Sequence, residues 1–179
     1  MIALALRLFG RRARRWRAGE QWRVAEDVRF AQVPRTIALS SPAFANGGAL
    51  PAGSASPPLA WTGAPEATRR LVLIVEDVDA PLLRPFTHAV AYAIDPATAS
   101  LGAGALNDAH VPMGVNGAGT RTYVAPAPPP AHGPHRYVFT LLAVDYVPRF
   151  DQAPTRGRTL DAIAGHVVAL GELVGTAER

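Results

Sequence analysis

The sequence predicts a mainly β protein in which antiparallel strands are joined by long, stiff loops and followed by one helix. Short apolar runs, rich in branched and aromatic side chains, indicate the strands. The chain has 16 glycines and 17 prolines among 179 residues, well above the usual combined share of about 12%. These residues separate short elements. No regular alternation of strands and helices is present, which argues against a parallel α/β fold.

The expected strands lie between loops that contain proline. The run Leu71–Val75 is apolar at every position, which is typical of a strand covered on both faces. We expect further long strands at His88–Ile94 and Arg136–Val144, and a short strand at Ile37–Leu39. The segment Ala125–Pro134 contains five prolines and therefore predicts a stiff loop.

One helix is expected at the end of the domain. Thr159 can cap its first turn, and apolar residues follow at spacings of three or four. These residues are Leu160, Ile163, Val167, Leu170 and Leu173 or Val174. The spacing predicts an amphipathic helix that packs against the strands.

Positive charge is concentrated at the start of the chain. All 18 basic residues are arginine, and eight of them lie in residues 1–30 beside three acidic residues. The rest of the chain has ten arginines and eleven acidic residues, so a basic face for nucleic acid is not expected. We divide the chain into a basic N-terminal extension, residues 1–33, and a domain, residues 34–179. We expect residues 1–30 to supply little of the core.

The first residues allow two interpretations. In a helix, Ile2, Leu6 and Phe9 would share one face with arginines on the other, an arrangement typical of peripheral membrane contact. The alternative, which we favour, is a solvated tail. Most of the positive charge follows the apolar run, whereas a secretory signal has it in front. We therefore expect a cytoplasmic protein, and a periplasmic location stays open.

The chain has no cysteine, which excludes disulfide scaffolds, thiolate zinc sites and cysteine nucleophiles. Candidate polar residues instead lie at strand ends. Asp77 and Asp79 directly follow the strongest strand, His88 opens the next, and His132 and His135 precede the third. Such a group could bind a metal, act as general acid and base, or form a polar pocket that binds an anion.

The first two of these readings have weak support in the sequence. His88 and His135 are far apart in the chain, and no histidine pair has helical metal-ligand spacing. The Gly-x-Ser-x-Gly motif of hydrolases is absent, and no glycine-rich phosphate loop has the required spacing. We therefore expect no enzyme activity, no catalytic residues, no metal and no cofactor.

Four motifs together resemble the phosphatidylethanolamine-binding protein (PEBP) family, in particular its bacterial Raf-kinase-inhibitor-like branch. They occur in the family's order over roughly residues 37–176. The motifs are SPPLAWTGAPE (56–66), VEDVDAP (75–81), FTHAVAYAI (86–94) and APAPPPAHGPHRYVFTLLAVD (125–145). The resemblance implies antiparallel β-sheets in a Greek-key arrangement with a C-terminal helix, and a small pocket for phosphate-type head groups.

The resemblance also implies roles for individual residues. The pocket residues would be Asp77, His88, His135 and Tyr137, by match to the family's motifs. A second set would support the pocket, as an ion pair or loop anchor, as core or pocket wall, and as the position whose backbone meets the anion. This set is Asp79, Arg136, Trp61 and Ala125.

Four positions depart from the family's pattern. Val78 stands in place of a proline, Ala125 and Ala131 in place of glycines, and Ala177 in place of a tyrosine. These departures suggest a pocket of altered shape.

The function expected from the sequence is binding of an anionic small molecule or a phospholipid head group. Two alternatives stay open: a regulator that inhibits a kinase or protease through protein contact, and an acid–base enzyme that uses His88 and His135. Bacterial relatives suggest a homodimer. If His88 and His135 hold an anion as imidazolium groups, its affinity should fall as the pH rises.

Overall fold

A computed structural model describes residues 2–108 and 110–179. These residues contain two helices, seven strands and four single-turn 3-10 helices (η). In chain order they are α1 (Ile2–Ala13), η1 (Glu20–Trp22), η2 (Val24–Glu26), η3 (Val28–Phe30), β1 (Ala38–Ser40), β2 (Leu59–Thr62), β3 (Arg70–Asp77), β4 (Phe86–Ile94), β5 (Ser100–Leu101), η4 (Ala105–Asn107), β6 (His135–Val144), α2 (Arg156–Ile163) and β7 (Val167–Ala177).

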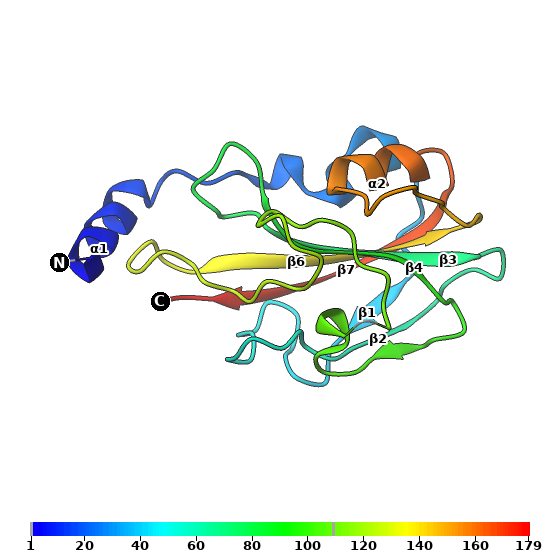
Figure 1. Cartoon of the computed structure of the whole chain (residues 1–179), viewed down its shortest axis with the longest axis horizontal. Helices are drawn as coiled ribbons and strands as arrows, with labels where there is room; N and C mark the ends of the chain where they lie inside the picture. The colour runs from blue at the N-terminus through cyan, green and yellow to red at the C-terminus, as the bar shows by residue number, and fades with distance from the viewer. Residues whose placement is uncertain (1, 109) are drawn as a thin grey trace.

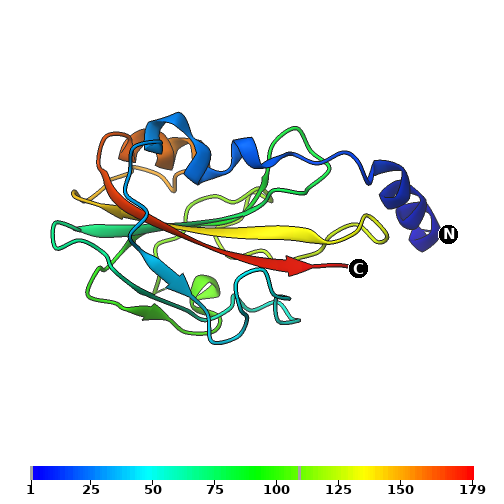
Figure 2. The same cartoon turned by 180° about the vertical axis from the view of Figure 1, so that it is seen from behind.

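The strands form two antiparallel sheets, which confirms the predicted fold class. The larger sheet has the order β4-β3-β6-β7 and the smaller one the order β1-β2-β5. In Figure 1 the smaller sheet lies below the larger one. Helix α2 and the turns of the N-terminal segment lie above the larger sheet. Figure 2 shows the same three layers from behind. No helix among residues 2–108 and 110–179 is long and apolar enough to cross a membrane.

Strand β3 is buried on both faces, as its continuous apolar run predicted. Leu71, Leu73 and Val75 belong to the core between the two sheets. Val72 and Ile74 point to the other face and belong to a second core beneath α2. Side chains alternate between the two faces of a strand, so an unbroken apolar run satisfies both layers.

The C-terminal prediction is correct in placing a helix here but wrong about its cap and about the residues after Ile163. Thr159 lies inside α2, where its hydroxyl donates to the Thr155 carbonyl at 2.9 Å, instead of capping the first turn. Thr155 caps α2, and the helix ends at Ile163 rather than continuing through Val167, Leu170 and Leu173 or Val174. Those residues lie in β7, which pairs with β6 over its full length. Apolar residues spaced three or four apart can also serve a strand that is covered on both faces, so the spacing alone did not distinguish the two.

Glycines separate α2 from β7 and allow β7 to pack closely. Gly165 follows α2 with a φ of +79°, a conformation that L side chains rarely adopt. A Cβ atom on Gly171 would lie 2.1 Å from the backbone oxygen of Ile37. The chain before β1 can therefore run directly against β7, where Ile37 N donates to the Leu170 carbonyl at 3.2 Å.

The N-terminal segment contributes to the core, contrary to the expectation for residues 1–30. Val24, Ala25 and Phe30 are almost fully buried in the core beneath α2. Val24 N also donates to the buried side chain of Glu76 at 3.1 Å. Only the part before these turns, which includes α1, lies outside the two cores. The division of the chain at residue 33 stays a prediction.

Candidate functional site

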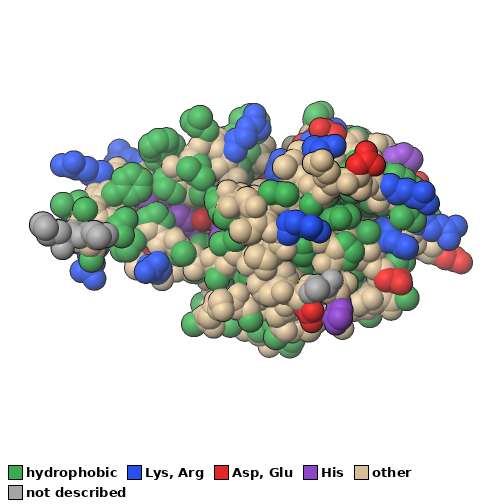
Figure 3. Space-filling model, viewed as in Figure 1, with side chains coloured by type: hydrophobic (Ala, Val, Ile, Leu, Met, Phe, Trp, Pro, Cys, Tyr) green, Lys and Arg blue, Asp and Glu red, His purple; other side chains and the backbone are tan. Residues whose placement is uncertain are grey.

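A cavity of about 280 Å³ opens where β3 ends and where β4 and β6 begin. Its base is polar and its walls are apolar. The lining residues are Asp77, Ala80, Pro81, Leu82, Phe86, His88, Val124, Ala125, Ala127, Pro128, Pro129, His135 and Tyr137. In Figure 3 a small area of histidine surface is visible between the N-terminal helix and the body of the protein, with apolar side chains around it.

The order of strands in the larger sheet brings the polar residues together. Asp77 ends β3, and its backbone partner on β6 is Tyr137. On the other side of β3, Asp77 pairs with Phe86, two residues before His88 on β4. His135 begins β6. The structure therefore brings together all four pocket residues predicted from the sequence, although their role in binding stays a prediction.

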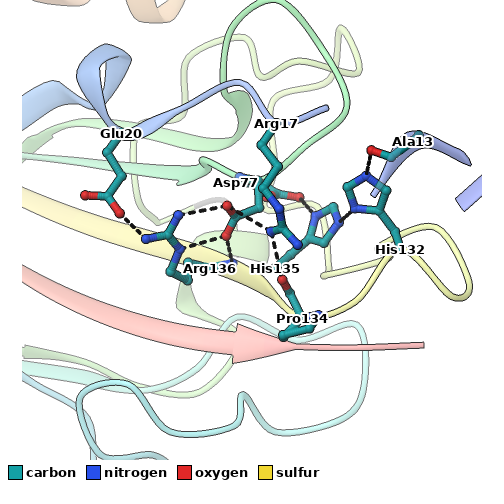
Figure 4. A network of polar contacts seen from close by, with 9 residues as sticks. Ala13, Arg17, Glu20, Asp77, His132, Pro134, His135 and Arg136 are labelled. Atoms are coloured by element: carbon teal, nitrogen blue, oxygen red, sulfur yellow. Dashed lines mark hydrogen bonds and ion pairs between the residues drawn. The ribbon is translucent and has the colours of Figure 1, made fainter. Parts of the chain in front are cut away.

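Asp77 and two histidines form a continuous chain of hydrogen bonds (Figure 4). His135 Nδ1 lies 2.7 Å from Asp77 Oδ2, and His135 Nε2 lies 2.7 Å from His132 Nδ1. His132 Nε2 in turn donates to the backbone oxygen of Ala13 at 2.7 Å. Both ring nitrogens of His135 are thus engaged within the protein. His132 itself is buried.

Within residues 2–108 and 110–179, His88 has a hydrogen-bond partner for only one of its two ring nitrogens. Its Nδ1 donates to the carbonyl of Val124 at 2.6 Å, because a carbonyl oxygen can only accept. Burial lowers the pKa of His88, so the ring is neutral near pH 7 and Nε2 carries a lone pair. The ring also meets Tyr137 edge-on, with 5.0 Å between the ring centres.

Tyr137 has a buried hydroxyl with no hydrogen-bond partner among the described residues. Its side chain is fully buried and lines the cavity. Burial, and next the charge of Asp77, raise the pKa of this hydroxyl, so it stays protonated. A buried hydroxyl without a partner is costly, and a bound group in the cavity would satisfy it.

A second polar group supports the base of the cavity from behind. Arg136 donates through Nε and Nη2 to the carboxylate of Asp79, each at 2.8 Å. Arg17 Nη1 lies 2.9 Å from the same carboxylate, and Glu20 contacts Arg136. Burial alone would raise the pKa of Asp79, but the hydrogen bonds from Arg136 and Arg17 outweigh it and lower the pKa to about 2.

The other predicted supports lie in different places. Ala125 lines the cavity, whereas Trp61 belongs to the core between the sheets. His132 was noticed in the sequence but was not assigned to the site. Its position three residues before His135 was the available signal, but the contact with Ala13 depends on a helix that begins the chain. No group of three or more His, Asp or Glu in residues 2–108 and 110–179 has a metal-binding arrangement.

A comparison with models of protein families shows which family the chain belongs to. A model of the phosphatidylethanolamine-binding proteins matches residues 40–178. The chain belongs to this family. The matched range includes every residue that lines the cavity, and α1 lies before it.

Known PEBP-like proteins show the same relationship. A UPF0098 protein of Methanothermobacter thermautotrophicus is 39% identical over 129 residues, which cover 69% of this chain and 83% of that protein. The crystal structure of a putative PEBP homologue from Chlamydia trachomatis superposes with a TM-score of 0.75 at 34% identity, covering 81% of this chain and 99% of that one. E. coli YbcL, at 21% identity, shares the fold with a TM-score of 0.74 over 80% of this chain and 99% of that one.

Two departures from the PEBP pattern have structural consequences. Val78 N donates to the Arg136 carbonyl at 3.2 Å, a bond that the proline of the pattern cannot make. Ala131 has a φ of +63°, so it adopts the left-handed conformation that a glycine takes more readily. The backbone of the loop is therefore strained at Ala131.

Proposed function

We propose that the cavity binds a small anionic ligand of the phosphate type, such as a phospholipid head group. The observation that carries this proposal is the buried hydroxyl of Tyr137, which lines the cavity and has no partner among the described residues. A phosphate oxygen supplies the acceptor that this hydroxyl lacks. The apolar walls, from Ala80 and Pro81 to Pro129, suit the hydrocarbon part of such a ligand.

The second contact to the ligand is His88. Its Nε2 is free and can bind a proton, and a nearby anion favours the charged form of the ring. A charged imidazole donates a stronger hydrogen bond than a neutral one. Asp77 would repel an anion, but its hydrogen bond from His135 at 2.7 Å offsets that charge. We therefore assign Tyr137 and His88 as donors and His135 as the residue that positions and neutralises Asp77.

Binding without turnover is the form of activity that the site supports. Acid–base catalysis by His88 and His135 requires two groups that exchange protons with the substrate. Both ring nitrogens of His135 are engaged by Asp77 and His132, which leaves His88 as the histidine in the cavity with a free nitrogen. The purified protein should therefore leave phosphate mono- and diesters intact. Hydrolysis that is lost in His88→Gln would contradict this.

The binding proposal is tested by calorimetric titration with glycerophosphoethanolamine, a phosphodiester that keeps one charge across the pH range used. Tyr137→Phe removes only the hydroxyl and should weaken binding about tenfold at pH 6. Tyr123→Phe is the matched control, because Tyr123 is buried nearby but does not line the cavity. Equal affinities of the wild type and Tyr137→Phe would overturn the assignment of the hydroxyl. Absence of binding by the wild type would overturn the proposed ligand class.

We further propose that α1 contacts an anionic lipid surface. The apolar residues Leu4, Leu8 and Phe9 are exposed by between 47% and 65%. Trp16, just after the helix, is exposed by 52%. Five arginines lie in residues 7–15, and no acidic residue precedes Glu20. Exposed apolar side chains beside arginines are the features of a helix that lies in a membrane interface.

Sedimentation with lipid vesicles tests this contact. The wild type should bind vesicles that contain phosphatidylglycerol and should bind pure phosphatidylcholine far more weakly. Phe9→Ser should reduce binding severalfold, whereas Val147→Ser, an exposed apolar residue elsewhere, should not. Equal binding to both kinds of vesicle, or unchanged binding of Phe9→Ser, would rule out this role for α1.

A further inference from the structure

The hydrogen-bond chain from Asp77 to α1 contains one proton more than its groups supply in their ordinary states. The chain has three contacts, each at 2.7 Å, joining Asp77 to His135, His135 to His132, and His132 to the carbonyl of Ala13. Each contact needs one proton. The carboxylate of Asp77 and the carbonyl of Ala13 bring none, and two neutral imidazoles bring two. The complete chain therefore holds one additional proton.

The location of this proton follows from the surroundings of the two rings. Burial is the main cause that lowers the pKa of His132, and the charges of His135 and Arg17 act in the same direction. His132 is therefore the ring that accepts an additional proton less readily, and its own proton lies on Nε2, facing the Ala13 carbonyl at 2.7 Å. The additional proton lies between Asp77 and His135, and the count is the same whichever of the two carries it.

We propose that this proton controls the docking of α1. While Asp77, His135 and His132 share three protons, the chain is complete and α1 is held. When one proton leaves, one of the three contacts has lone pairs facing each other. The full negative charge of the Asp77 carboxylate keeps a proton at its contact with His135, so the facing lone pairs arise between the two rings or between His132 and the Ala13 carbonyl. The contact with α1 is the one that can open to relieve this repulsion. Docking of α1 should therefore weaken as the pH rises.

The docked helix also fixes one wall of the cavity. A Cβ atom on Gly10 would lie 2.1 Å from the backbone oxygen of Pro130, so α1 lies directly on the proline-rich loop. Arg14 Nε donates to the Ala131 carbonyl at 2.9 Å, and Arg17 Nη1 donates to the Pro134 carbonyl at 3.0 Å. Pro128 and Pro129 of this loop line the cavity. Release of α1 would thus free the wall.

Most charged groups around this hydrogen-bond chain do not titrate between pH 5.5 and 8.5. Arg14 and Arg17 stay charged at any pH used here. Asp79 has a pKa of about 2, and the pKa of Tyr137 is raised by burial. His88 faces the same base from β4, and burial lowers its pKa. His88 is therefore the group whose effect must be separated from that of the hydrogen-bond chain.

The cysteine-free chain allows the position of α1 to be measured directly. Cysteines introduced as Ala3→Cys and Ala67→Cys, both at exposed positions, can carry spin labels, and pulsed electron resonance then gives the distribution of distances between them. We expect one narrow distribution at pH 5.5. At pH 8.5 the ratio of docked to released molecules should fall about tenfold, the effect of one lost buried hydrogen bond. No ligand is present, so the result is independent of what the cavity binds.

Three variants in this labelled background identify the cause. Gly10→Ala leaves the histidines in place but forces α1 off Pro130. In this variant α1 should be released at both pH values, and its distance distribution is the reference for the released state. Asp77→Asn supplies the third proton from its amide, which can donate to His135 Nδ1, so the hydrogen-bond chain is complete with two neutral rings and the distance distribution should not depend on pH. His88→Gln should respond to pH as the wild type does. A wild-type distribution that is unchanged with pH, or a response in Asp77→Asn equal to that of the wild type, would overturn the proposal.

Discussion

Arg136 holds the carboxylate of Asp79 by three hydrogen bonds, two from its guanidinium at 2.8 Å and one from its own backbone N at 2.9 Å. The bonds tie the loop after β3 to the start of β6, at the points where Asp77 and His135 enter the cavity. The side chain of Asp79 is 1% exposed, so its carboxylate is shielded from water. The geometry of the candidate site therefore depends on a pair that does not line the cavity.

This pair predicts a loss of stability in acid. The pKa of Asp79 is lowered from 3.8 to about 2 in the folded protein, so the folded state binds this proton less readily than the unfolded state. The resulting stabilisation, about 2 kcal/mol, is present above pH 4 and is lost as the pH falls towards 2. Urea unfolding at several pH values should show Asp79→Asn to be less stable than the wild type at pH 6. The difference should shrink towards pH 2, and a constant difference would contradict the assigned pKa.

The packing of the N-terminal turns predicts that truncating the Phe30 side chain greatly lowers the stability of the protein. This side chain is 2% exposed and packs beneath α2, so Phe30→Ala should reduce the free energy of unfolding by about 3–5 kcal/mol. Val28, two residues earlier, is 85% exposed, and Val28→Ala should change it by less than about 0.5 kcal/mol. Denaturant unfolding measures both. Similar small values would mean that these turns do not belong to the folded core.

The conformation of Ala131 predicts a stabilising substitution. Its φ of +63° costs a residue with a Cβ atom about 1–2 kcal/mol, and glycine removes that cost but gains freedom in the unfolded chain. Ala131→Gly should therefore raise the free energy of unfolding by about 0.5–1 kcal/mol. Ala127→Gly, in the same loop but without a positive φ, should lower it. Thermal or urea unfolding distinguishes the two signs.

Anion binding should be linked to protonation of His88. Burial lowers the pKa of this ring in the empty cavity, and a bound anion raises it, so binding takes up a proton at neutral pH. The affinity for glycerophosphoethanolamine should then fall as the pH rises from 6 to 8.5, by at most about tenfold for each pH unit. The slope should be smaller in His88→Gln than in the wild type, because only the effect of α1 release on the cavity wall would remain. Calorimetry in buffers of different ionisation enthalpy counts the proton directly, and a wild type that takes up none would contradict this linkage.

Local sequence patterns predicted the strands whose apolar side chains pack against neighbouring layers. The apolar runs of β3, β4 and β6 indicated strands because each supplies side chains to a covered sheet face. The residues of β7 were assigned to a helix because their spacing fits both periods. Pairing with β6 resolved that ambiguity, and pairing between distant strands leaves no local signal.

The polar residues of the site were predictable for a different reason. Asp77, His88, His135 and Tyr137 lie at strand ends in motifs that resemble one family, and side chains at strand ends project from a rigid frame. Their types and positions could be read from the sequence. The hydrogen-bond partners of the histidines could not, because they include the carbonyls of Val124 and Ala13, both supplied by other segments.

The sequence by itself thus determined the fold class, the family and the four polar residues that the cavity brings together, since these follow from apolar periodicity and from motifs that resemble one family. The tertiary structure alone decided the place of residues 2–30. Val24 and Phe30 are buried beneath α2, and Ala13 accepts a hydrogen bond from His132, 119 residues away. A short basic segment cannot bury its few apolar side chains by itself, so its conformation is set by the surface against which it packs.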